Sequence, residues 1–346
     1  MKPSSALIIQ TAFLGDVILT TPLIDALAQA YPGIFIDFLT IPVSVNTIET
    51  HPALRHIFAY DKRGNDAGLS GILRMARMLK QQNYDICLCP HRSLRSAYLT
   101  FRTKAKIRIG FHNSSWRGGF TDLVPYRQNH HEIERNLSLL KPLDISLPLS
   151  KPTVVPDTHD RHIVEQQVNT HAPGQQNTLF AVAPGSIWPT KRWPKRHFAD
   201  FCKRLIAQGW IPVLIGSEDD YALCSEIVKL AGGGMNLAGK ISIRQTGYLL
   251  SRCRGLLTND SAPLHLAMAF DIPVFAIFGA TIPEFGFGPF GPKGFVLERK
   301  DVGCRPCGIH GGKKCPVKTF ECMEQINADE VFTKVNTYFA TVDKSF

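Results

Sequence analysis

The chain has 346 residues, of which 44% are hydrophobic and 20% are charged, a composition that excludes disordered and fibrous proteins. The 39 lysines and arginines exceed the 29 aspartates and glutamates, so the net charge of +10 favours anionic partners: nucleic acid, phosphorylated metabolites or an anionic membrane face. No apolar run approaches the roughly 18 residues of a membrane-spanning helix, and the N-terminus becomes polar too soon for a signal peptide.

The first half of the chain alternates short apolar runs with amphipathic stretches. Residues 6–10 (ALIIQ) predict a buried strand, and a helix is expected to follow it as far as Ala30. Helical spacing of apolar residues also predicts a helix over 71–82. Further strands are expected at 34–39, 84–89 and 106–110. This alternation indicates βαβ units and a parallel sheet.

The pattern lapses between residues 147 and 176, where Pro, Thr, His, Asp and Gln dominate and only a short helix near 163–168 is expected. A second α/β series follows. Its expected strands are 179–184, 211–216, 255–258 and 272–279, and its expected helices are 195–208, 221–231, 263–270 and 328–339. The sequence therefore predicts two doubly wound, Rossmann-like domains that face each other across a cleft. The expected segments are 1–160, 161–325 and a closing C-terminal helix at 326–346.

Ligands of open parallel sheets bind beyond the carboxyl ends of the strands, so the loops after predicted strands are the candidate sites. The first such loop runs from Thr11 to Asp16. Its Gly15-Asp16 pair has two interpretations. Gly15 forms a turn and Asp16 caps the following helix, or Asp16 projects into the cleft as a carboxylate base. Neither a G-x-G-x-x-G fingerprint nor a P-loop is present.

The loop after residues 179–184 contains Pro184-Gly185-Ser186 and then Lys191-Arg192. Backbone amides, a hydroxyl and a lysine at a strand–helix junction are the groups that a diphosphate requires. The plainer interpretation is a solvated basic turn beside a packed Trp193. Because the loop lies at the expected binding edge, we favour the diphosphate.

Two more loops carry candidate groups. Asp260 or Ser261 can cap a helix that begins near Pro263, and the amides of that helix start would attract phosphate. His265 lies in the first turn of the same helix, either facing the pocket or as a structural histidine. Glu218 follows residues 211–216 and is placed to bond a ribose, whereas Asp219 and Asp220 are expected to cap the next helix.

Two metal-like patterns are present. His130-His131-Glu132 lacks the second histidine of H-E-x-x-H, because Arg135 stands in its place, so no zinc protease is implied. Cys304, Cys307, Cys315 and Cys322 fall within nineteen residues and are compatible with a tetrahedral zinc site. Reduced thiols are the default expectation, since nine cysteines in a large chain fit a reducing, cytoplasmic compartment.

Nucleic-acid binding is the rival explanation of the positive charge. The basic residues, however, are scattered over many segments, and no recognisable nucleic-acid module accompanies them. We therefore expect small anionic ligands and no nucleic acid.

Taken together, the loops resemble those of the ADP-heptose:lipopolysaccharide heptosyltransferases (glycosyltransferase family 9), with heptosyltransferase II the most similar type. The motifs occur in the family's order over nearly the whole chain. They are Gly15-Asp16, Pro184-Gly185, Lys191 to Pro194, Gly216-Ser217, Asn236 to Lys240, Thr258 to Ser261, and His265.

This resemblance implies a GT-B fold and a metal-independent, inverting transfer without a cofactor. The acceptor would bind the N-terminal domain and the nucleotide sugar the C-terminal one. It implies Asp16 as general base, with Lys191 stabilising the leaving diphosphate. The donor would contact Ser186, Ile187, Lys191, Glu218, Ile241, Asp260, Ser261, Ala262 and His265.

The acceptor of this family is an acidic, phosphorylated glycolipid core. Lys62, Arg63, Arg92 and Arg95 are candidates to hold it, because cationic side chains, and arginines above all, suit phosphate and carboxylate groups. Such a surface would place the enzyme in the cytoplasm, peripheral to the inner face of the inner membrane. The alternatives are the same fold with another nucleotide sugar and, with less support, a basic nucleic-acid-binding protein.

Overall fold

The computed structural model describes residues 2–172, 174 and 178–342, and the chain divides into two compact units after Val155. The predicted boundary was residue 160. The division lies earlier because helix α7 (Thr158–His171) is bound to the second unit: Arg244 of α10 (Ile243–Ser251) bonds Asp160 at 2.7 Å and Asp157 at 3.2 Å. α7 also extends well beyond the short helix expected near 163–168.

In the described part of the first unit, six parallel strands form a sheet of order β3-β2-β1-β4-β5-β6. The central strands are continuous apolar runs because both faces of a parallel sheet are covered. The strands are β1 (Ser5–Ile9), β2 (Phe35–Thr40), β3 (Leu54–Ala59), β4 (Ile86–Cys89), β5 (Ile107–Phe111) and β6 (Asp122–Val124).

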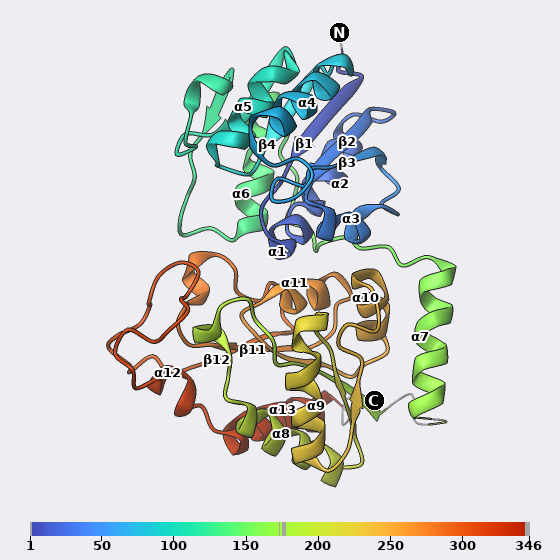
Figure 1. Ribbon diagram of the computed structural model, residues 1–346, viewed down its shortest axis with the longest axis vertical. Coiled ribbons are helices and arrows are strands. Elements are labelled where there is room, and N and C mark those ends of the chain that lie inside the picture. Colours follow the sequence, from blue (N-terminus) through green and yellow to red (C-terminus); the bar gives the residue numbers. More distant parts are fainter. Residues whose placement is uncertain (1, 173, 175–177, 343–346) are drawn as a thin grey trace. The chain divides into compact units, whose positions relative to one another are not determined.

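The helices of the first unit cover both faces of this sheet (Figure 1). On the face that carries Leu7 and Ile9 lie α4 (Gly68–Gln81) and α5 (Leu94–Thr103). On the face that carries Ala6 and Ile8 lie α1 (Leu14–Ile18), α2 (Thr21–Ala30), α3 (Pro42–Ile48) and α6 (Glu132–Ser138).

The single helix expected to run as far as Ala30 is in fact two helices. The break falls at Leu19 and Thr20, and Pro22 lies in the first turn of the second helix, where a residue without an amide hydrogen is tolerated. The Thr20 hydroxyl donates to the Asp16 carbonyl at 2.7 Å. The break therefore leaves Asp16 on a short helix of its own.

The second unit repeats the architecture. Among its described residues, six parallel strands have the order β12-β11-β10-β7-β8-β9. The strands are β7 (Leu179–Ala183), β8 (Ile211–Leu214), β9 (Met235–Asn236), β10 (Leu256–Asn259), β11 (Val274–Phe278) and β12 (Gly294–Glu298). The remaining helices are α8 (Lys195–Ala207), α9 (Tyr221–Ala231), α11 (Ala262–Ala269), α12 (Glu321–Glu324) and α13 (Ala328–Val342).

Trp193 is the largest side chain buried in the second core, where it packs with residues of α8, α9 and α13. Its indole nitrogen donates to the carbonyl of Ile326 at 2.7 Å, and its backbone amide donates to the Asn259 side chain at 2.9 Å. Burial of an indole with its N–H satisfied fixes the loop between β7 and α8.

The order of strands reverses between β1 and β4 in the first sheet and between β7 and β10 in the second. At such a reversal the connections leave towards opposite faces, so the adjacent carboxyl ends of the strands are where ligands bind. Three of the candidate loops follow β1, β7 and β10, and the fourth follows β8 next to β7. The fold thus confirms the predicted α/β class with parallel sheets, and it places the candidate loops at or beside the reversals.

Across residues 2–172, 174 and 178–342, none of the helices is long and apolar enough to cross a lipid bilayer.

The Asp160–Arg244 pair provides a test of the new boundary. Both side chains are less than a tenth exposed, so Asp160→Ala leaves a buried guanidinium without its main partner. We expect a loss of about 3–5 kcal/mol in the unfolding free energy of the second unit, measured by urea denaturation. Asp157→Ala, which removes a half-exposed helix cap, should cost only about 1 kcal/mol. Equal costs would contradict this assignment.

Candidate functional site

Asp16 lies just beyond the carboxyl end of β1, in the third position of helix α1. Its carboxylate accepts a hydrogen bond from the Phe13 amide at 3.2 Å, so it also serves as the helix cap that the sequence allowed. The side chain is half-buried. Burial raises the pKa of Asp16 to about 7, and the negative charge of Glu132 acts in the same direction, while the Phe13 amide and Arg92 oppose the shift.

Three of the four cations proposed for the acceptor gather around the same loop. The Lys62 ammonium donates to the Thr11 carbonyl, and Arg95 donates to the Lys62 carbonyl at 3.5 Å. Arg92 acts electrostatically on Asp16 and lies over the ring of Tyr126, 4.1 Å from its centroid. Burial and the positive charges of Arg63 and Arg95 lower the pKa of Lys62. Arg63 itself is exposed.

His91 is a site residue that the sequence did not indicate. It follows β4, and its Nδ1 lies 3.0 Å from the Thr11 hydroxyl and 2.8 Å from the Ser96 hydroxyl. Burial lowers the pKa of His91 to about 4, with the positive charges of Lys62 and Arg92 acting in the same direction. The imidazole is therefore neutral near pH 7, and it joins the loops after β1 and β4 as a hydrogen-bonding group.

In the second unit, Lys191 and Asp260 form a largely buried ion pair across the strand-order reversal, with 2.6 Å between Nζ and Oδ2. The Thr281 hydroxyl donates to the same carboxylate oxygen at 2.6 Å. Asp260 therefore does not cap α11; Ser261 occupies the cap position, without a side-chain hydrogen bond to the helix. The pair holds an ammonium at the carboxylate that directly precedes the cap residue of α11.

Asn259, which precedes Asp260 at the end of β10, ties the two loops together. Its amide nitrogen donates to the Pro184 carbonyl at 2.9 Å, while its oxygen accepts from the Trp193 amide. Within the loop that it holds, the Ser186 carbonyl accepts from Arg192 at 2.8 Å, and Ile187 is 71% exposed. Asn259 belongs to the Thr258–Ser261 motif, but its role depends on residues 66 and more positions away.

The other predicted donor residues lie on several elements of the second unit. Ala262 begins α11 and is half-buried, and His265 is buried one turn later. Glu218 is exposed in the turn after β8, and its backbone packs against Gly239. Ile241 is half-buried before α10. Asp220 occupies the cap position of α9 as predicted, but its carboxylate accepts hydrogen bonds from the amide and hydroxyl of Ser217 in the preceding turn and makes none to the helix.

A glycine pair far along the chain supports the Lys191 loop. Gly312 exchanges hydrogen bonds with Thr190: its amide donates to the threonine hydroxyl at 2.7 Å, and its carbonyl accepts from that hydroxyl at 3.0 Å. Gly311 has a φ of +78°, and a β-carbon there would lie 3.0 Å from Lys191 Cγ. The segment after β12 thus closes over the loop that carries Lys191, a contact that sequence analysis missed.

Comparison with known proteins identifies the family of this chain. Residues 72–314 match the family model of glycosyltransferase family 9 (heptosyltransferase), which is more than half of the chain. The chain belongs to this family. The matched span includes Lys191, Asp260 and His265, while Asp16 and Lys62 precede it.

Individual relatives extend the similarity beyond the matched span. Lipooligosaccharide heptosyltransferase 2 of Haemophilus influenzae is 27% identical over 81% of this chain and 84% of its own. Lipopolysaccharide heptosyltransferase 1 of Pseudomonas aeruginosa is 28% identical over 87% of this chain and 85% of its own. Relatives named as types 1 and 2 thus match about equally well.

Solved structures show the same fold. A family 9 glycosyl transferase from Veillonella parvula has a TM-score of 0.87, with 23% identity and 96% of both chains covered. ADP-heptose lps heptosyltransferase II of E. coli has a TM-score of 0.79, with 21% identity and 98% and 99% covered. These matches confirm the GT-B fold, and the family model confirms the resemblance seen in the sequence.

The four cysteines of the candidate zinc motif lie in the segment that reaches Thr190. Cys304, Cys307, Cys315 and Cys322 carry free thiols, and burial raises the pKa of the Cys322 thiol to about 11. In the ranges that the structure describes, no set of three or more Cys, His, Asp and Glu side chains is grouped to hold a metal ion. Arg305 anchors the segment by bonding the carbonyls of Gly279 and Thr281 and pairing with Glu298 at 2.9 Å.

Removing the Thr190 hydroxyl should release this segment. Thr190→Val leaves the Gly312 amide without its acceptor, at a cost of about 1–3 kcal/mol. We expect trypsin to cleave faster at the exposed Lys313 and Lys314, and mass spectrometry measures the rate of that cleavage. Thr246→Val is the matched control, because the Thr246 hydroxyl donates locally, to the carbonyl of Ser242 at the start of α10. Equal cleavage rates in the two variants would show that the Thr190 hydroxyl does not hold the segment, whose carbonyl at Gly312 also accepts from the Thr190 amide at 3.2 Å.

Proposed function

We propose that this chain transfers a heptose from ADP-heptose to the inner core of lipopolysaccharide, with inversion and with Asp16 as the general base. The observation that carries the proposal is the Asp16 carboxylate, which combines a pKa near 7 with three cations gathered around its loop. Family membership supports the heptosyl transfer, and the ADP-heptose enzyme of E. coli, which shares the fold, supports the donor.

In an inverting transfer, the acceptor hydroxyl attacks the anomeric carbon from the face opposite the leaving group. Asp16 would take the hydroxyl proton as the new C–O bond forms and the bond to ADP breaks. A carboxylate of ordinary pKa is a weak base near neutrality, and the raised pKa of Asp16 makes it a stronger acceptor of that proton. General-base assistance of this kind contributes roughly 10²–10⁴-fold to the rate.

The donor diphosphate is proposed to bind at the strand-order reversal of the second unit. Negative charge that develops on the departing ADP would be stabilised by Lys191 and by the first amides of α11, near Ser261 and Ala262. Asp260 holds the Lys191 ammonium at this edge, so the cation is in place before the donor arrives. The other proposed contacts are Ser186 and Ile187 along the diphosphate, Glu218 on the ribose, Ile241 against the adenine, and His265 in the same pocket.

The acceptor is proposed to bind the first unit through Lys62, Arg63, Arg92 and Arg95. Phosphate groups of a lipopolysaccharide core suit such a cluster, because guanidinium groups bind phosphate in a bidentate way. Leu94 is 60% exposed beside Arg95, which places an apolar side chain next to the cations. We propose that this surface makes peripheral contact with the inner face of the inner membrane, where a lipid-anchored acceptor is met.

The base is tested by Asp16→Asn. We expect turnover with ADP-heptose and a core acceptor to fall by roughly 10²–10⁴-fold. In the wild type, kcat/KM should fall about tenfold per pH unit below pH 7, since only ionised Asp16 takes a proton and its pKa is about 7. Asp122→Asn, a carboxylate of β6 that bonds Thr121, should leave the rate unchanged. Undiminished turnover by Asp16→Asn would remove Asp16 from the mechanism.

The donor class is tested by thermal unfolding with nucleotides. ADP at 100 times its Kd should stabilise the native state by about 2.7 kcal/mol, whereas UDP and GDP should do so far less. Lys191→Met should abolish the rise in Tm with ADP, and Lys195→Met, whose ammonium pairs with Glu226 on the surface, should keep it. A larger rise with UDP or GDP would replace ADP-heptose by another nucleotide sugar.

A further inference from the structure

The first unit contains a cavity of about 300 Å³ that no residue of the proposed mechanism lines. It is bounded by the end of β6, by α6, by the 3₁₀ turn Lys141–Leu143 and by the segment that follows this turn. β6 stands at one end of the described strand order, which leaves room for a cavity beside it. Small-molecule sites have volumes of roughly 300–1,000 Å³, so this cavity admits a small ligand or one end of a larger one.

One wall of the cavity is apolar. Ile145, Leu147 and Leu149 line it at alternate positions of a segment that is neither helix nor strand. Ile145 and Leu147 are partly buried against the core of the first unit, whereas Leu149 is 40% exposed. Val124 of β6 and Leu140 line the same cavity and are buried. A wall that the core holds in place on one side can remove the apolar part of a ligand from water on the other, which favours binding.

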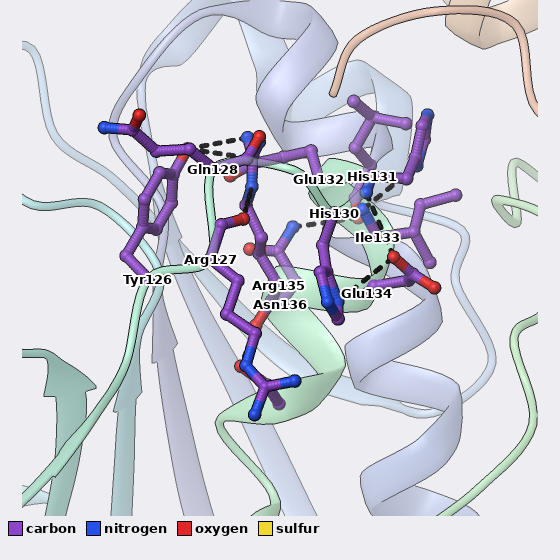
Figure 2. A network of polar contacts seen from close by, with 12 residues as sticks. Tyr126, Arg127, Gln128, His130, His131, Glu132, Ile133, Glu134, Arg135 and Asn136 are labelled. Atoms are coloured by element: carbon purple, nitrogen blue, oxygen red, sulfur yellow. Dashed lines mark hydrogen bonds and ion pairs between the residues drawn. The ribbon is translucent and has the colours of Figure 1, made fainter. Parts of the chain in front are cut away.

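A second wall carries polar side chains of α6 and of the residues on either side of it. His130, Glu134, Ser138 and Lys141 line the cavity, and residues spaced by three or four positions share one face of a helix. Among the described residues that line the cavity, Glu134 is the only acidic one. It pairs with His130 at 3.2 Å and accepts a hydrogen bond from the His131 amide at 3.1 Å (Figure 2). Its negative charge is therefore already engaged within α6 and the loop before it.

Two cations of the lining are not engaged in this way. Within the part of the chain that the structure describes, neither the Arg127 guanidinium nor the Lys141 ammonium forms a hydrogen bond or an ion pair with another residue. Both side chains are exposed. Figure 2 shows the Arg127 side chain extending from the loop between β6 and α6, with no contact drawn at its guanidinium. Both positive charges are thus available to a ligand.

The loop that carries Arg127 is held by a buried charged side chain. Arg135 is 2% exposed and lines the cavity, and its guanidinium donates to the carbonyls of Arg127, at 2.9 Å, and of Gln128. Its charge is matched by Glu132, whose Oε2 accepts from Arg135 at 2.8 Å and from the Tyr126 hydroxyl at 3.0 Å. These bonds fix the backbone of the loop before a ligand arrives, so less order has to be created on binding.

We propose that this cavity is a binding site for a small amphipathic phosphate. Its phosphate would bond Arg127 and Lys141, and its apolar body would lie against Ile145, Leu147 and Leu149. Two cations match the charge of a phosphate monoester, which is about −1.5 to −2 near pH 7, better than the single charge of a carboxylate. A guanidinium also binds phosphate in a bidentate way. The inference goes beyond the proposed transfer reaction and does not rest on it.

The two walls make different demands on a ligand. An uncharged apolar molecule would leave the cations unused, and inorganic phosphate would leave the apolar wall in contact with water. A molecule that has both parts should therefore bind more tightly than either part alone. Soluble phosphate esters and the heads of acidic membrane lipids share this chemistry, although the volume of the cavity admits only one end of a lipid.

The probe is phenyl phosphate, which has both parts and is soluble. The δ1-methyl resonance of Ile145, identified by its absence in Ile145→Val, reports binding at this cavity rather than at the proposed donor or acceptor sites. We expect phenyl phosphate to shift it saturably, and inorganic phosphate and benzyl alcohol to bind roughly tenfold more weakly or worse. An unchanged resonance, or equal affinity for either partial probe, would overturn the proposal.

Variants test the two walls separately. Arg127→Ala combined with Lys141→Ala removes two exposed cations, so the protein should fold, and we expect phenyl phosphate to bind roughly tenfold more weakly or worse. Arg77→Ala combined with Lys80→Ala is the matched control, because it removes two exposed cations from α4, on the other face of the sheet. It should leave the affinity unchanged. Equal affinities of the two double variants would overturn the proposal.

The apolar wall is tested by Leu149→Ser. This variant should weaken the binding of phenyl phosphate and leave that of inorganic phosphate unchanged, since only the phenyl ring contacts the wall. An unchanged affinity for phenyl phosphate in Leu149→Ser and in the Arg127 and Lys141 double variant would show that neither wall takes part.

Vesicles distinguish the two sources of the phosphate. Sedimentation with phosphatidylcholine vesicles that contain phosphatidic acid is compared for the wild type and both double variants. A loss confined to Arg127→Ala with Lys141→Ala supports a lipid head as the ligand, and equal sedimentation of the two double variants supports a soluble phosphate ester. None of these measurements uses turnover, so failure of this proposal would leave the proposed function intact, and the reverse also holds.

Discussion

Both units depend on the same constraint: a parallel sheet whose strand order reverses beside its first strand. The two strands at the reversal must be held together at their carboxyl ends, although their loops lead to different faces. In the first unit, His91 makes this connection by lying within hydrogen-bond distance of Thr11. In the second unit, Asn259 does so by bonding the Pro184 carbonyl and the Trp193 amide. In each case one polar side chain at the end of one strand satisfies groups in the loop of its neighbour.

The hydrogen bonds of His91 and Asn259 do not use the candidate carboxylates, which remain at the carboxyl edge of each sheet. Asp16 follows Thr11 by five positions, and Asp260 directly follows Asn259. The two carboxylates then differ in their partners. Asp260 is neutralised by Lys191 and bonded by Thr281, so it serves to hold a cation. The Asp16 carboxylate accepts a hydrogen bond from a backbone amide, and a nearby negative and a nearby positive side chain shift its pKa in opposite directions. The surroundings of Asp16 therefore control its own protonation.

Local sequence predicted the fold class and the central strands of both sheets, because continuous apolar runs bounded by turns are typical of buried parallel strands. It also selected candidate loops that the fold places at or beside the strand-order reversals, where ligands of such sheets bind. It predicted no element at the outer strands β3, β6, β9 and β12 or at the helices α3, α5, α6, α10 and α12. At α6 the buried face includes Glu132, Arg135 and Asn136, and polar residues buried in a helix mask its apolar periodicity. The contacts that it missed join residues far apart in sequence: Thr11 with His91, Leu19 with Asn136, and Thr190 with Gly312.

The net charge of +10 suggested anions but not where they bind, and the positions of the cations are more informative than their number. Arg92 both belongs to the proposed acceptor surface and lowers the pKa of Asp16. A phosphate that pairs with Arg92 would offset its positive charge at Asp16, and the carboxylate would become more basic as the acceptor binds. Under the proposed function, recognition of an acidic acceptor and activation of its hydroxyl would therefore be coupled through one guanidinium. That coupling requires the Arg92 guanidinium to lie near both the acceptor phosphate and Asp16. Its contact with the Tyr126 ring helps to fix its position.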